Sequence, residues 1–155
     1  MQPGAWDPAG FLASNDPLAD VLARDAATLR RLGIEPSRLG RGLEDLLRAG
    51  AGSDALLPAD VGEYEVEVRR QRGLITCPWA PEEHEACPIG GGGGRPTANR
   101  FVLRHRGSGR RVEGFELSIH LIRAHGFFGG PGTRFRIEPE DLAGVLGLGD
   151  LKGSP

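Results

Sequence analysis

The spacing of hydrophobic residues changes once along this chain, and that change constrains the fold more than any other feature. Between residues 18 and 47, leucines and valines recur at the intervals of helices with one buried face. From Glu63 to Arg69, apolar residues instead alternate with charged ones, as in a strand with one face in water. The sequence therefore predicts helices followed by strands, an arrangement typical of the α+β class.

The first predicted helix opens at Asp16 and Pro17, because aspartate is a preferred N-cap and proline is favoured at the first helical position. Gly33 follows the last leucine of the pattern, where a left-handed C-terminal cap would lie. Residues 1–15 are rich in turn formers, and we expect them to form an arm that lies over the rest of the protein. The large apolar residues of this arm are Trp6, Phe11 and Leu12.

A second helix is predicted from Pro36 or Ser37 to about Arg48, with Gly50 ending it. Gly40 and Gly42 lie inside it and weaken it by about 1 kcal/mol each relative to alanine. The two helices would form a helical hairpin joined by a short turn. The residues from position 50 to position 60 are interpreted as a loop.

Two β-hairpins are predicted in the middle of the chain. In the first, Glu63–Arg69 would turn at Gly73 and return as Leu74–Thr76. In the second, Arg100–His105 and Arg110–Gly114 flank a turn made of glycine and serine. Together they predict a small antiparallel sheet.

Three further elements complete the expected fold. Phe115–His125 is interpreted as a central helix stopped by Gly126. A short strand at Thr133–Ile137 and a helix from Pro139 to about Leu148 would close the chain. The expected fold class is therefore α+β, with an N-terminal helical hairpin, an antiparallel sheet of two β-hairpins, a central helix and a C-terminal strand and helix.

Length and composition agree with a small globular protein. The 155 residues favour one compact unit with a helical extension, and we divide it into an arm and helical hairpin over residues 1–60 and an α+β zinc-binding domain over 61–155. The run Gly90–Gly94 lacks the ending of a phosphate-binding P-loop and is interpreted as a flexible loop. A net charge of −2 gives no general attraction to nucleic acid or to anionic lipid.

The sequence also indicates a compartment. No run of about 18 apolar residues predicts a membrane span, and residues 1–10 lack the basic start and apolar core of a secretory signal. We therefore expect a cytoplasmic protein that does not bind membranes. In that compartment, two cysteines favour a metal site or buried thiols over a structural disulfide.

Four residues form the candidate metal site: Cys77, Cys87, His120 and His125. Zinc prefers four nitrogen or sulfur ligands, and the histidine spacing lies within the range used by Cys2His2 sites. The nine residues between the cysteines exceed the two to four usual in a zinc knuckle, so no family is assigned. We expect a structural zinc ion held between the cysteine loop and the central helix.

Other interpretations of these residues stay open. His84 or His105 could replace one of the four ligands, or the cysteines and histidines could simply pack in the core. A catalytic site would need an open zinc position and a carboxylate base such as Glu116, Glu83 or Glu85. The H-E-x-x-H motif is absent, however, and a Cys–His nucleophile pair has no sequence signature here.

Arginines are concentrated in the predicted sheet, and five of them flank the second hairpin: Arg100, Arg104, Arg106, Arg110 and Arg111. Such a patch could contact phosphates, with Trp79 or a phenylalanine stacking on a base. It could equally be a solvated sheet face on which Glu65 and Glu67 pair with arginines across strands.

The sequence thus favours a small, non-enzymatic interaction module with a structural zinc site and a protein partner. The alternatives are an arginine-mediated nucleic-acid-binding protein and a zinc-dependent hydrolase. Phe127 and Phe128 lie among glycines, where aromatic residues are expected to be tucked under the loop rather than exposed for a partner.

Overall fold

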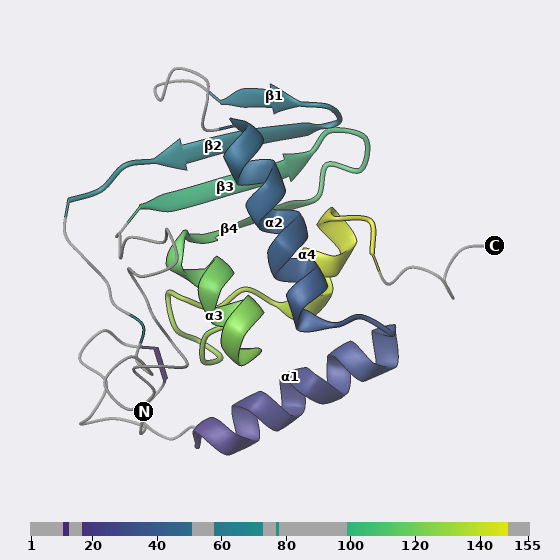
Figure 1. Cartoon of the computed structure of the whole chain (residues 1–155), viewed down its shortest axis with the longest axis vertical. Helices are drawn as coiled ribbons and strands as arrows, with labels where there is room; N and C mark the ends of the chain where they lie inside the picture. The colour runs from purple at the N-terminus through teal and green to yellow at the C-terminus, as the bar shows by residue number, and fades with distance from the viewer. Residues whose placement is uncertain (1–10, 13–16, 51–57, 73–76, 78–98, 149–155) are drawn as a thin grey trace.

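The computed structural model describes residues 11–12, 17–50, 58–72, 77 and 99–148. These residues form helices and an antiparallel sheet, which confirms the α+β prediction (Figure 1). In chain order the elements are α1 (Leu18–Leu32), α2 (Pro36–Gly50), β1 (Ala59–Val61), β2 (Tyr64–Arg69), β3 (Arg100–His105), β4 (Arg111–Phe115), α3 (Leu117–His125) and α4 (Pro139–Val145).

The sheet follows the order β1-β2-β3-β4, with every neighbouring pair antiparallel. Its register places Val66 opposite Leu103 and Leu103 opposite Val112, so these side chains share one face. They pack against Leu43 of α2, which lies across the sheet in Figure 1. The opposite face carries the charged residues of the alternating pattern.

α2 comes very close to its neighbours at two glycines. A Cβ atom at Gly40 would overlap the side-chain stem of Arg123 on α3, and one at Gly50 would come within 2.9 Å of Val66 on β2. Arg123 also forms an ion pair with Glu44 of α2. Gly40, which weakens the helix by propensity, is therefore a position where another element presses against it, whereas a Cβ atom at Gly42 would make only an ordinary contact with Leu146.

The predicted ends of the first and central helices are confirmed at their C-termini. Gly33 and Gly126 adopt left-handed conformations, with φ of 71° and 62°, and cap α1 and α3. The start of α1 differs from the prediction, because Pro17 is the N-cap residue with extended backbone rather than the first helical residue. Asp16, the predicted cap, lies outside the described residues.

Other elements also differ from the prediction. Phe115, predicted to begin the central helix, is the last residue of β4, and α3 begins at Leu117. Ala59 and Asp60, expected to be loop, form an edge strand with Val61 that pairs with β2. The strand predicted at Thr133–Ile137 is wrong, since this segment turns instead: the Arg136 N–H bonds the Thr133 carbonyl at 3.2 Å. The predicted return strand Leu74–Thr76 lies outside the described residues.

The core has two parts. The sheet core packs aliphatic residues of all four helices and of β2–β4, together with Phe101 and Phe128. The phenylalanine cluster contains the following buried residues: Phe11, Leu12, Val21, Cys77, Phe115, Leu117, Leu121, Phe127 and Phe135. Phe127 and Phe128 are buried as predicted, and Phe11 and Leu12 confirm that this part of the arm packs on the body.

The sheet core joins α2 to the strands, so residues on both sides of the predicted boundary at position 60 pack together. In the described part of the chain, no helix is long and apolar enough to cross a membrane.

Candidate metal centre

Four metal ligands are predicted, and the structure describes three of them. These three meet beside α3. The ligand atoms of Cys77, His120 and His125 all lie within 4.8 Å of one another. The Cys77 Sγ lies 3.4 Å from the His125 Nε2, and the two imidazole rings are 5.2 Å apart between centroids in an edge-to-face arrangement. The group joins a residue of the cysteine loop to the central helix, as expected from the sequence.

The end of α3 explains how its two histidines meet. Side chains five residues apart on a regular helix point about 140° apart around its axis. His125 is the last residue of α3, and Gly126 turns the chain away directly after it. The His125 ring therefore lies at the open end of the helix, where it reaches both the His120 ring and the Cys77 sulfur.

Burial sets the protonation of this group. Cys77 is 1% exposed within the phenylalanine cluster, and both histidines are half-buried. Desolvation lowers the pKa of His125. Desolvation, followed by the charges of His125 and Arg123, lowers the pKa of His120. Both imidazoles are therefore neutral at pH 7, which is the form that binds a metal ion.

The distances suit a tetrahedral ion. With zinc–sulfur and zinc–nitrogen bonds of about 2.3 and 2.0–2.1 Å, two such ligands lie about 3.6 Å apart. The observed separation of 3.4 Å between the Cys77 sulfur and the His125 nitrogen is close to this value. A thiol–imidazole hydrogen bond would explain that one distance but not the convergence of His120. The three residues can therefore hold a metal ion.

The remaining predicted ligands do not join the group or lie outside the described residues. Cys87 and His84 are in the second category. His105 lies at the tip of the β3–β4 hairpin, where its Nδ1 is 3.0 Å from the Ser108 Oγ and its Nε2 is 3.1 Å from a Glu63 carboxylate oxygen. Both of its ring nitrogens are thus engaged away from the metal group.

The carboxylates proposed for catalysis also do not join the metal group or lie outside the described residues. Glu116 precedes α3 and accepts a hydrogen bond from the Asn99 side-chain amide at 3.3 Å. Glu83 and Glu85 lie outside the described residues. The lowered pKa of His125 also disfavours the imidazolium that would hold a Cys77 thiolate as a nucleophile.

Most of the arginines around the second hairpin face acidic residues. Arg104 lies 3.4 Å from Glu65 on β2, which is one of the two predicted cross-strand partners. The other ion pairs are Arg100–Glu113, Arg106–Asp60 and Arg111–Glu113. In the described part of the chain, Arg110 alone of these five arginines forms no ion pair. The sheet face thus resembles a solvated, charge-balanced surface.

A buried ion pair between Asp25 and Arg136 is not among the features that the sequence predicts. Asp25 of α1 is 2% exposed and accepts two hydrogen bonds from the Arg136 guanidinium, at 2.7 and 2.9 Å. Arg136 also donates to the Gly129 carbonyl at 3.0 Å. The sequence does carry a signal for this pair, because Asp25 interrupts the apolar face of α1 midway between Val21 and Leu29. This pair fixes α1 to the loop after α3.

The chain was also compared with known proteins. No protein-family model, curated protein or solved structure matched it. Its function is therefore argued from the Cys77, His120 and His125 group alone.

Proposed function

We propose that Cys77, His120 and His125 bind a structural zinc ion, with Cys87 as the fourth ligand, in a small non-enzymatic interaction module. The observation that carries this proposal is the convergence of the three side chains. Cys77 and His125 are 48 residues apart in the sequence, yet their ligand atoms and that of His120 lie within 4.8 Å. Such convergence of one thiol and two imidazoles is typical of zinc coordination.

The fourth ligand decides the class of site. Structural zinc sites are closed by four protein ligands, whereas catalytic sites keep one position for water or substrate. Cys87 is the other cysteine of the chain and follows Cys77 after nine residues. A Cys2His2 set has no open position, so the ion would stabilise the fold rather than act on a substrate.

A structural zinc ion would stabilise the contact between Cys77 and α3. Cys77 belongs to the phenylalanine cluster, and α3 carries residues of both clusters. Structural zinc binding is worth about 10–16 kcal/mol in zinc-finger peptides, which matches or exceeds the 5–15 kcal/mol stability of a typical domain. The ion would therefore secure the Cys77 segment against α3.

The first experiment measures zinc per chain in untagged protein purified without chelator. We expect about one equivalent, and loss of zinc from the Cys77→Ser and His120→Ala variants. His105→Ala is the matched control, because His105 lies outside the group and should leave the zinc content unchanged. Absence of zinc from the native protein, or its retention in a Cys77→Ser/His120→Ala double variant, would refute the site.

Cobalt substitution tests whether the site is closed. In a closed Cys2His2 site, Co²⁺ should give the absorption of tetrahedral coordination with two thiolates, and Cys87→Ser should reduce the thiolate charge-transfer band by about half. An unchanged spectrum in Cys87→Ser would show that Cys87 is not a ligand. Water as the fourth ligand would then support the zinc-dependent hydrolase instead.

A further inference from the structure

β4 forms an edge of the sheet, and its pairing with β3 leaves main-chain groups unpaired. The His105 N–H bonds the Arg110 carbonyl, and the Gly109 N–H bonds the His105 carbonyl, both at 2.8 Å. Because hydrogen-bonding direction alternates along an antiparallel strand, Val112 also faces β3. Arg111 and Glu113 therefore direct their N–H and C=O groups away from the sheet, and no described residue bonds them.

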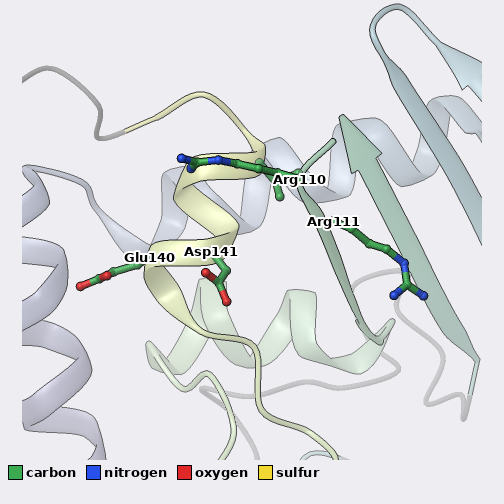
Figure 2. Close-up of a pocket in the computed structure, with 5 residues that line it drawn as sticks. Arg110, Arg111, Glu140 and Asp141 are labelled. Carbon is green, nitrogen blue, oxygen red and sulfur yellow. The ribbon is translucent and has the colours of Figure 1, made fainter. Parts of the chain in front are cut away.

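A groove lies beside this edge. A cavity of about 510 Å³ is lined by Arg110 and Arg111 at the start of β4 and by Glu140, Asp141 and Val145 of α4 (Figure 2). This volume falls within the range of small-ligand sites, about 300–1,000 Å³, and is sufficient for a few residues of extended peptide.

Two charges at the groove have no ionic partner among the described residues. Figure 2 shows Arg110 extending from the start of β4 across the last turn of α4, where its guanidinium lies against Gly144. Asp141 lies at the other end of α4. The remaining charged residues of the lining are neutralised, since Arg111 pairs with Glu113 and Glu140 pairs with Arg31.

We propose that this groove binds the C-terminus of an extended peptide, which adds to β4 as an antiparallel strand. The inference rests on the proposed role of the protein as an interaction module, but it does not require the metal ion. An antiparallel strand on β4 runs toward Arg110, so its terminal carboxylate would meet the unpaired guanidinium. Its main chain would bond Arg111 and Glu113.

The register also predicts a side-chain preference. The third residue from the peptide C-terminus would lie level with Val112 and share its face, the side on which α4 lies. Asp141 and Val145 line the groove there. A lysine or arginine at that position would pair with Asp141, so the preferred ligand is a peptide that ends in a basic residue followed by two others.

The test uses a fluorescein-labelled peptide ending Ser-Val-Lys-Val-Val with a free carboxylate. We expect saturable binding by fluorescence polarisation, weakened at least about tenfold by C-terminal amidation or by Arg110→Ala. Asp141→Asn should remove the preference for lysine over glutamate at the third position. Arg104→Ala is the matched control, because Arg104 pairs with Glu65 on the sheet face and should not change the affinity.

Backbone methylation identifies strand addition. Methylating the amide of the penultimate residue, which would face Arg111, should abolish binding, whereas methylating the preceding amide should not. Equal affinity of the acid and amide peptides, or a Kd above about 1 mM, would overturn the proposal. Self-association that excludes the peptide would place a second copy of the chain on this edge instead.

Zinc content measured on the same samples separates the two proposals. If the purified protein contains no zinc but binds the peptide, the groove proposal stands and the structural zinc site is refuted. If the protein contains one equivalent of zinc but does not bind the peptide, the zinc site stands and the peptide-binding proposal is refuted.

Discussion

The two parts of the core are built in different ways. The sheet core consists mostly of leucine, isoleucine and valine from helices and strands, and Leu39, Leu43 and Leu103 in it are fully buried. The phenylalanine cluster takes most of its rings from segments between or at the ends of elements. Phe11 and Phe135, for example, stack with centroids 4.1 Å apart although neither belongs to a helix or strand.

This difference shows two sources of order in one small protein. Periodic side chains position the sheet core, because each helix and strand presents one apolar face. Individual contacts position the phenylalanine cluster: the Gly130 N–H bonds the Phe11 carbonyl at 2.7 Å, and Arg136 binds Asp25. A metal ion at Cys77 would add another contact of this kind. The second region should therefore be the more sensitive to loss of a single partner.

Metal removal should give the largest effect. Treating zinc-loaded protein with a strong chelator should lower the melting temperature markedly, since the metal contribution in small domains is on the order of 10 kcal/mol. Amide hydrogen exchange should rise first in α3 and at Phe127, while β3 stays protected. Equal acceleration in α3 and β3 would show that the two regions do not differ in their dependence on the ion.

Loss of the buried ion pair should come next. Asp25→Ala leaves the Arg136 guanidinium, whose side chain is 12% exposed, without its main partner. Breaking a buried pair in this way costs about 3–5 kcal/mol of unfolding free energy, which urea denaturation would measure. Glu140→Ala is the control, because its pair with Arg31 is exposed and should cost less than about 1 kcal/mol. Equal effects of the two substitutions would contradict a structural role for Asp25.

A cavity in the sheet core should destabilise the protein without disturbing the metal group. Leu43 is fully buried, so Leu43→Ala should cost about 2–5 kcal/mol in urea denaturation. Leu46 is half-buried at the edge of the same core, and Leu46→Ala should cost less. Zinc content should stay unchanged in both variants. Loss of zinc from Leu43→Ala would show that the two regions are coupled more tightly than their construction indicates.

The smallest effect concerns pH. A hydrogen bond from Arg136 holds the pKa of Glu138 below its ordinary value of 4.5. Its contribution is therefore present above pH 4.5 and disappears as the pH falls through the lowered pKa. Because Glu138 is largely exposed, Glu138→Gln should cost under about 1 kcal/mol at pH 7, and this cost should shrink as the pH is lowered below 4.5. A cost that does not change as the pH falls would mean that charge is not the cause.

The predictable part of this structure is the part built from periodic pattern and glycine caps. The α2 leucines, the alternation in β2 and the turn at Gly109 each follow from local sequence, and each is present. The sequence predicts a strand at residues 133–137. This segment turns instead, because Arg136 is held by Asp25 and Gly129, contacts that no local pattern contains.

The candidate metal site also has a part that the sequence predicts and a part that depends on tertiary contacts. Residue type and spacing predict Cys77, His120 and His125 as ligands, since the chain has two cysteines and four histidines, and these three lie together in the structure. Sequence alone could not separate His105 from this set. Its engagement by Ser108 and Glu63 depends on the pairing of β2 with β3, which brings together residues 42 positions apart.

The contact between Gly40 and Arg123 has a consequence for the order of folding. A helix that carries glycine at positions 40, 42 and 50 is unstable alone, so an isolated peptide of α2 should be mostly unstructured in water. Besides its packing on the sheet, α2 is stabilised by contacts with α3, as in the Arg123–Glu44 pair across 79 positions. Closing so long a loop precedes the gain from its contacts, which slows folding. We therefore expect α2 to become helical only when α3 has reached it.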